Sequence, residues 1–468
     1  MNKKKFDVAV IGAGPGGYPA AIKLAQNGKT VCLIEKKYLG GSCLNVGCIP
    51  TKTLLANALI MHKLRRAEDY GIYAENLHFD YAKMRARKDG VIETIRKSLE
   101  GLLKLNKIEI LSGTAEFLSP EELKVKGEEN LLIQADQVII ATGSEPLDIP
   151  AFACDHEKIL NSSSVLELKA LPKSLAIIGG GYIGCEFASL FAEFGVKVTI
   201  LEGLSSIVSF QGKTIADALT QAFKKKGIDV QTSVFVEGVD REGNGVSIRI
   251  KGQPSFQSDL ALVSVGRKIN SENLGLEKAG VKTGTKAEIL VNDKLETSVP
   301  GIYAVGDVTG KFLLAHVATH QGLIAASNIL GHSAKMHYHA VPAVIFTLPE
   351  IATVGMTLEE AQKEGYEATI GKFPFQVLGK SIASLDTEGF AQVVIDKKTG
   401  QILGAQVVGH DAATMISEMS LAIANELTID CIADTIHAHP TTPEAWLEAA
   451  LLANDTPLHF PPKKRSVS

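Results

Sequence analysis

The chain has 468 residues, 45% of them hydrophobic, and a formal net charge of −4. This length exceeds what one ordinary hydrophobic core accommodates, so we expect two to four domains. The weakly acidic balance offers no basic footprint for nucleic acid, and no apolar run approaches the roughly 20 residues of a membrane helix. We therefore expect neither nucleic-acid nor membrane partners.

The first element along the chain is an apolar strand, predicted over 7–11, with three lysines (Lys3–Lys5) just ahead of it. No hydrophobic segment of a secretion signal accompanies those lysines. Four of the six cysteines are scattered and are expected to be buried as small hydrophobic residues, as in a reducing cytosol. These four are Cys32, Cys154, Cys185 and Cys431. We therefore expect a cytoplasmic protein.

A glycine-rich turn follows the first strand. Gly12, Gly14 and Gly17 form the pattern G-x-G-x-x-G, a helix is predicted to about residue 28, and a second strand ends at Glu35. In a dinucleotide-binding unit the first glycine makes the tight turn, the second admits a pyrophosphate and the third lets helix and strand pack closely. The terminal acid accepts a hydrogen bond from a ribose hydroxyl.

Two cysteines follow this unit: Cys43 and Cys48 lie within 40–52, which reads GGSCLNVGCIPTK. Thiols this close along the chain can form a small disulfide ring, and a ring beside a bound nucleotide suggests electron transfer between sulfur and cofactor. Two buried thiols, or half of a zinc site, are the alternatives. No other cysteine pair or histidine lies near enough for a local metal pattern, so we expect no metal. A long helical stretch is predicted next, over 52–106.

The glycine-rich device then occurs a second time. Gly179, Gly181 and Gly184 follow a strand over 175–178, and Glu202 ends the next strand. Each position lies 167 residues after its counterpart in the first copy. One glycine motif is weak evidence, but two copies with strand, helix and acid in register favour two Rossmann-like units and hence two nucleotides.

The last part of the chain, from about residue 341, changes character: short strands such as 402–408 alternate with an apolar helix predicted over 412–427. His439 and Glu444 lie near the C-terminus of the chain. A histidine can change charge near neutral pH and suits proton transfer with thiols, and a nearby carboxylate can fix its tautomer. An ordinary surface pair is the alternative. His437 is expected to be a structural neighbour.

Four segments together resemble the flavin-dependent pyridine nucleotide–disulfide oxidoreductases. They are the cysteine stretch 40–52, the stretch 299–307 ending in Asp307, the stretch 314–316, and the stretch 439–444. The resemblance covers about residues 5–460. It implies an α/β fold with two Rossmann-like dinucleotide-binding domains, one for FAD and one for NAD, and an α+β C-terminal dimerisation domain.

The resemblance also implies domain limits. We expect an FAD-binding domain in two parts, 1–147 and 271–340, around an NAD-binding domain over 148–270. The dimerisation domain is expected over 341–468, with a frayed basic tail from residue 461 onward.

The family's cofactor-binding residues can be carried over to matching positions. For FAD they are Gly12, Gly14, Gly17, Glu35, Lys52, Gly113, Ala141, Thr142, Gly143, Asp307 and Ala315. For the nicotinamide nucleotide they are Gly179, Gly181, Gly184, Glu186, Glu202, Val236, Gly266 and Arg267. The resemblance places Lys52 and Glu186 as an ion pair near the reactive edge of the flavin.

The catalytic roles are likewise implied by the resemblance. Cys43 is expected to exchange with the substrate, and Cys48 to lie against the flavin. His439 is expected to be the base, oriented by Glu444, and to serve the cysteines of the partner chain in a homodimer.

The substrate is the more open question. Glu202 is followed by 203–210, which contain no Lys or Arg, and a 2′-phosphate would need such cations, so NAD is favoured over NADP. This argues against glutathione reductase, an NADPH enzyme. No cysteine follows Cys431, whereas mercuric reductase and the large thioredoxin reductases carry an additional C-terminal pair.

What remains is oxidation of dihydrolipoyl groups on carrier subunits of 2-oxoacid dehydrogenase complexes, with reduction of NAD. Another NAD(P)H–disulfide reductase of the same family, or a non-catalytic flavoprotein subunit, are the alternatives.

Overall fold

Strands from two distant parts of the sequence form the first sheet. In the computed structural model, which describes residues 2–461, this seven-stranded sheet has the order β3-β2-β1-β6-β5-β4, and β17 (Ile302–Ala304) pairs with β6. The other strands are β1 (Asn2–Ile11), β2 (Val31–Glu35), β3 (Glu109–Ser112), β4 (Thr114–Ser119), β5 (Glu122–Lys126) and β6 (Leu131–Ile140). The β1, β2, β3 and β17 pairings are parallel, and β4 to β6 form an antiparallel extension.

Helices pack on this sheet and beside it. α1 (Gly17–Gln26) contacts α8 (Ala315–Ile329), and the short helices α7 (Leu276–Ala279) and η5 (Gly306–Thr309) lie nearby. The predicted helical stretch over 52–106 consists of two helices, α3 (Cys48–Arg65) and α4 (Tyr81–Leu105), with the short helix η1 (Ala67–Tyr70) between them. The chain turns at Gly71, which has a φ of 73°, and Asp80 begins α4 by accepting a hydrogen bond from the Lys83 N–H.

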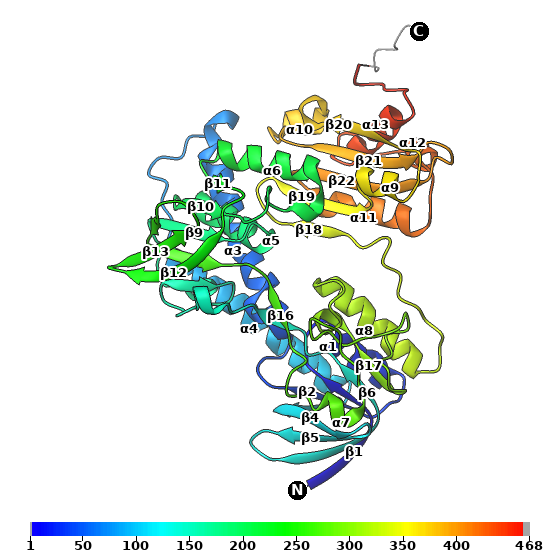
Figure 1. Cartoon of the computed structure of the whole chain (residues 1–468). Helices are drawn as coiled ribbons and strands as arrows, with labels where there is room; N and C mark the ends of the chain where they lie inside the picture. Colours follow the sequence, from blue (N-terminus) through cyan, green and yellow to red (C-terminus); the bar gives the residue numbers. More distant parts are fainter. Residues whose placement is uncertain (1, 462–468) are drawn as a thin grey trace.

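A second parallel sheet lies beside the first and has the order β11-β10-β9-β15-β8 (Figure 1). Its strands are β8 (Ile159–Asn161), β9 (Ser174–Ile178), β10 (Lys197–Leu201), β11 (Asp229–Gln231) and β15 (Leu260–Val263). The helices α5 (Tyr182–Glu193) and α6 (Lys213–Lys225) cover it, and an antiparallel sheet of β12 (Val236–Glu242), β13 (Gly245–Ile250) and β14 (Phe256–Ser258) is attached. The strands β7 (Ser144–Pro146) and β16 (Arg267–Ile269) pair with each other and connect the two units.

The third part is an antiparallel sheet of order β18-β19-β22-β21-β20. Its strands are β18 (Ala343–Ile345), β19 (Glu350–Gly355), β20 (Ala368–Pro374), β21 (Phe390–Asp396) and β22 (Ile402–Gly409). Its helices are α9 (Leu358–Lys363), α10 (Gly379–Ala383), α11 (Ala412–Ala424), α12 (Ile429–Ala433) and α13 (Glu444–Ala453). Helix α11 ends before Leu427, earlier than predicted. Its apolar residues Met415, Ile416, Met419 and Ile423 are buried, and Trp446 of α13 donates to the Met415 carbonyl at 3.2 Å.

One helical stretch, Gly41–Arg65, is long and apolar enough to cross a membrane by length and composition. The expectation that no apolar run approaches this length is therefore wrong. The stretch is two helices, α2 (Gly41–Val46) and α3, which pack against α4, and 44% of its most apolar window is buried inside the protein. Because core helices pass the same test, the stretch is weak evidence for a membrane span.

The expected fold class is confirmed: two α/β units and an α+β unit make up the described chain (Figure 1). The exact domain limits stay a prediction. The expected basic tail lies outside the described residues, apart from Pro461.

Candidate active site

The two glycine-rich turns have the same backbone geometry. Gly12 and Gly179 both have a φ of 102°, which favours glycine. A Cβ on Gly12 would overlap the Ala141 carbonyl oxygen. A Cβ on Gly17 would overlap the Gly12 carbonyl oxygen, and one on Gly184 the carbonyl oxygen of Gly179. The first and third glycines therefore allow each strand, turn and helix to pack together.

The second glycine of each turn faces open space instead. A Cβ on Gly181 would meet nothing within 4 Å, and one on Gly14 would meet only the Gly41 Cα, at 3.9 Å. Gly181 is also the residue immediately before α5, where backbone N–H groups are free to bind an anion. Both turns thus fit the pyrophosphate of a dinucleotide.

The acid that ends each second strand lies against its own glycine-rich turn. Glu35 Oε2 accepts from the Ala13 N–H at 2.8 Å, and Glu202 Oε2 accepts from the Gly180 N–H at 2.6 Å. The second oxygen of each acid accepts from the N–H of Lys37 or of Leu204. The two carboxylates are therefore fixed at the edge of the turn, where a ribose hydroxyl would lie.

The cysteines lie on either side of the break between α2 and α3. Cys43 is in α2, Gly47 interrupts the helix with a φ of −144°, and Cys48 is the first residue of α3. Both are free thiols. Hydrogen bonding from the Cys43 thiol lowers the pKa of Cys48 against the opposing effect of burial, and the nearby Lys52 ammonium lowers it further, so Cys48 is the thiol of the pair that ionises first.

The cysteine segment is held on the first glycine-rich turn. The Gly40 N–H donates to the Ala13 carbonyl at 2.9 Å. The buried Asn45 amide donates to the carbonyls of Leu39 and Gly41 at 2.9 and 2.8 Å, and its oxygen accepts from Arg96 Nε at 3.0 Å. We did not predict Asn45 as a site residue. Its signal was a polar side chain between two cysteines in a mostly apolar run.

An ion pair joins the cysteine helix to the second nucleotide unit. Lys52 Nζ lies 2.7 Å from Glu186 Oε2, and Glu186 is buried in α5. The other Glu186 oxygen accepts from the Phe346 N–H at 3.0 Å, and the Lys52 ammonium lies 4.6 Å from the centre of the Phe346 ring. The predicted pairing of Lys52 with Glu186 is present, and Phe346 from the third unit was not foreseen.

Asp307 and Arg267, which were assigned to different nucleotides, lie close together. Asp307 accepts a hydrogen bond from the Ser144 hydroxyl, and its Oδ2 lies 3.8 Å from Arg267 Nε. Arg267 also donates to the Ser144 hydroxyl and carbonyl at 2.7 and 2.8 Å. Arg267 therefore contacts the first unit through the β7–β16 pair.

The other predicted cofactor residues lie at the ends of strands or helices. The Gly113 N–H donates to the Glu35 carbonyl, and Ala141 follows β6. Positions 142 and 143 form the turn before β7, Ala315 begins α8, Val236 begins β12, and Gly266 immediately precedes β16.

The histidine and the glutamate near the C-terminus are hydrogen-bonded. His439 Nδ1 lies 2.8 Å from Glu444 Oε1, and because a carboxylate only accepts, Nδ1 carries the proton. Burial opposes ionisation of Glu444, but the Thr441 N–H, at 2.7 Å, and His439 outweigh it and hold the Glu444 pKa below its usual value. The side chain of His439 is 77% exposed in the single chain, so its Nε2 is free to accept a proton.

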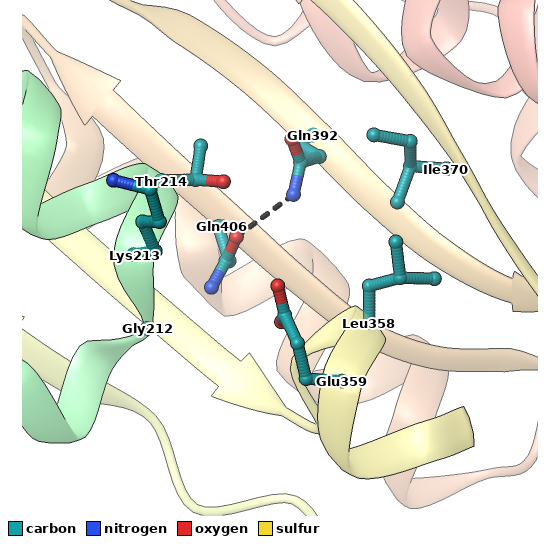
Figure 2. Close-up of a pocket in the computed structure, with 8 residues that line it drawn as sticks. All are labelled: Gly212, Lys213, Thr214, Leu358, Glu359, Ile370, Gln392 and Gln406. Carbon is teal, nitrogen blue, oxygen red and sulfur yellow. Dashed lines mark hydrogen bonds between the residues drawn. The ribbon is translucent and has the colours of Figure 1, made fainter. Parts of the chain in front are cut away.

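Two of the cavities among the described residues bear on the position of the site. The smaller, about 30 Å³, lies where α6 meets the third sheet, and Figure 2 shows the Gln392–Gln406 hydrogen bond at its wall. The larger, about 530 Å³, lies between α2 and α4 and is lined in part by Asn45 and Val46. Of these two, the larger one adjoins the cysteine segment.

Residues 6–322 match the pyridine nucleotide-disulphide oxidoreductase family, and residues 341–450 match the dimerisation domain of that family. The chain belongs to this family. It is 48% identical over 98% of its length to the dihydrolipoyl dehydrogenase of Chlamydia pneumoniae, and 42% identical over 97% to that of Geobacillus stearothermophilus. It covers 99% and 97% of those two proteins.

Solved structures agree. LpdA from Mycobacterium tuberculosis matches with a TM-score of 0.90 at 27% identity, over 96% of this chain and 99% of LpdA. The HOCl-induced flavoprotein disulfide reductase RclA from Escherichia coli matches with a TM-score of 0.87 at 30% identity, over 96% of this chain and 99% of RclA. The chain is thus a flavoprotein disulfide oxidoreductase that uses FAD and NAD, and its dimerisation domain supports a homodimer. The cytoplasmic location stays a prediction.

Proposed function

We propose that this oxidoreductase transfers electrons from dihydrolipoyl groups to NAD through Cys43 and Cys48. The observation that carries the proposal is the pair of thiols on either side of the break between α2 and α3, beside the Lys52–Glu186 ion pair. The near full-length similarity to dihydrolipoyl dehydrogenases supports this substrate over other disulfides.

In the proposed reaction, one thiolate of the dihydrolipoyl group attacks Cys43 of the oxidised pair. A bond forms between the two sulfurs, the Cys43–Cys48 bond breaks, and Cys48 leaves as the thiolate, which its lowered pKa favours. The second substrate thiol then displaces Cys43. Its electrons close the lipoyl disulfide and leave both cysteines reduced.

His439 is proposed to accept the proton of the attacking thiol at Nε2. Its Nδ1 is held by Glu444, so the ring presents one defined nitrogen to the substrate. The high exposure of His439 in the single chain suits a base that serves the cysteines of the partner chain.

The residues proposed to hold FAD are those of the first glycine-rich turn with Glu35, Lys52 and Asp307, and NAD is assigned to the second turn with Glu202. The chemistry that FAD supplies when bound is two-electron transfer from the reduced cysteines to NAD. The chain positions these partners and, through Lys52, favours the Cys48 thiolate.

The natural electron donor is proposed to be a lipoylated carrier subunit of a 2-oxoacid dehydrogenase complex. Capture of such subunits by the purified dimer, lost when the carriers lack lipoate, would support this.

The decisive experiment measures NADH formation by the purified FAD-loaded protein from dihydrolipoamide and NAD, with glutathione disulfide reduction as a comparison. We expect fast NADH formation and little glutathione reduction. NADH-dependent reduction of ferricyanide, which needs the flavin and not the thiols, provides the control. If only the control reaction occurs, the protein is a flavoprotein with a different substrate or none.

A further inference from the structure

His437, two residues before the proposed base, is built into the protein differently from His439. Its side chain is only 5% exposed, against 77% for His439. The two histidines lie on one loop between α12 and α13, yet only one faces solvent. The loop therefore has a buried histidine and an exposed one.

Both ring nitrogens of His437 meet an acceptor. Nδ1 lies 3.0 Å from the Thr435 carbonyl oxygen, and Nε2 lies 3.0 Å from Glu418 Oε1. Neither a carbonyl nor a carboxylate oxygen can donate, so both nitrogens must carry protons for both bonds to form. Beside a carboxylate, the geometry therefore favours an imidazolium at this position.

The electrostatics agree with that preference. The hydrogen bond to Glu418 of α11, together with its charge, raises the His437 pKa against the opposing effect of burial. The charge of Glu444 of α13 also raises that pKa. Both acidic neighbours favour the cation.

Glu418 lies on the helix that supports the rest of the loop. The Trp446 indole donates to the Met415 carbonyl, and the Thr442 hydroxyl donates to Asp411 Oδ2 at 3.2 Å. These contacts tie the C-terminal side of the loop to α11 and its start. On the N-terminal side of His439, the His437–Glu418 pair makes the corresponding tie.

We propose that His437 is a positioning residue that, as an imidazolium bound between Glu418 and the Thr435 carbonyl, fixes the loop presenting His439 to the cysteines. The inference rests on the proposed function, because it takes His439 to be the base. A rigid loop holds Nε2 where the substrate thiol arrives, so a loosened loop lowers turnover without removing the base itself.

The test uses four variants, all as FAD-loaded dimers. They are His437→Gln, Glu418→Gln, the double variant that combines these two substitutions, and His439→Gln, which removes the proposed base. We expect His437→Gln to lower kcat/KM for dihydrolipoamide by about ten-fold, the scale of one charge-assisted hydrogen bond, and to leave NADH–ferricyanide reduction unchanged. The double variant should be no worse than His437→Gln, since both substitutions break one interaction.

A second readout is the titration of the His437 ring in the wild-type dimer, followed by NMR of ¹³C-labelled histidine. We expect a midpoint above that of an ordinary histidine, shifted downward in Glu418→Gln. The inference would be overturned if the His437 ring were neutral at a pH below the pKa of an ordinary histidine. Full dihydrolipoamide turnover in His437→Gln would overturn it as well. Equal losses in both reactions would overturn it too, because they would show general damage. Full turnover in His439→Gln would instead reject the proposed base, and the inference with it.

Discussion

Lys52 and Glu186 form a 2.7 Å ion pair that connects the cysteine helix to the first helix of the second nucleotide unit. The pair lies close enough to Cys48 for both charges to act on it, with Lys52 lowering the Cys48 pKa and Glu186 raising it. Besides the larger effects of Cys43 and of burial, one thiol is therefore acted on in opposite directions by two side chains that are 134 residues apart in the sequence.

The two charges should be separable by mutation. Lys52→Met should raise the Cys48 pKa, and Glu186→Gln should lower it, because each removes one of the opposing effects. The measurement is the pH dependence of iodoacetamide alkylation of the reduced protein, read on the Cys48 peptide by mass spectrometry. Shifts in the same direction for both variants would show that the ion pair does not control this thiol.

The cysteines should be needed for turnover and not for cofactor binding. Cys43→Ser and Cys48→Ser should each abolish dihydrolipoamide oxidation, because neither can form the disulfide. Bound FAD, measured by absorbance after gel filtration, should stay at the wild-type level, since the glycine-rich turn and Asp307 are untouched. The reading of this site fails if either variant retains full turnover.

Cofactor choice should follow from Glu202. Its carboxylate is fixed against the Gly180 N–H, where a 2′-phosphate would be repelled, so we expect NAD to be preferred over NADP by at least about ten-fold in kcat/KM. Glu202→Ala combined with Ser205→Arg should shift the ratio toward NADP. Ser205→Arg alone serves as the control. Equal use of both nucleotides by the unaltered protein would place selectivity elsewhere.

A shared active site should be visible in mixed dimers. Co-expression of a Cys43→Ser chain with a His439→Gln chain should give about a quarter of wild-type activity under random pairing, because half of the dimers are mixed and each has one intact site. Each variant alone should be inactive. Verified mixed dimers with no activity would mean that cysteine and histidine of the same chain act together.

The first glycine-rich turn should not tolerate a larger residue at Gly17, for steric reasons. Gly17→Ala should lower the thermal midpoint and FAD content strongly, because its Cβ would overlap the Gly12 carbonyl oxygen. Gly90→Ala in α4, where a Cβ meets nothing within 4 Å, is the matched control and should stabilise by about 0.5–1 kcal/mol. Similar midpoints for the two variants would contradict the close packing of this turn.

Local patterns predicted much of this architecture. The glycine spacing predicts both nucleotide turns because a tight turn and a close helix–strand contact depend on residues a few positions apart. The contacts of His437 with Glu418, and of Glu186 with Phe346, join residues brought together only by folding, so no local pattern reveals them. The break between α3 and α4 was missed for a different reason: helical periodicity continues on both sides of it.

The two nucleotide units differ most in one crossover connection. Between β10 and β11 the chain forms the short helix η4 (Ser209–Gln211) and α6, whereas between β2 and β3 it passes through α2, α3, η1 and α4. Both connections leave and rejoin parallel neighbouring strands. Since the entropic cost of closing a loop grows only slowly with its length, such a connection can be enlarged while the sheet stays unchanged. A duplicated nucleotide-binding unit could thus gain a thiol centre by insertion at this one crossover.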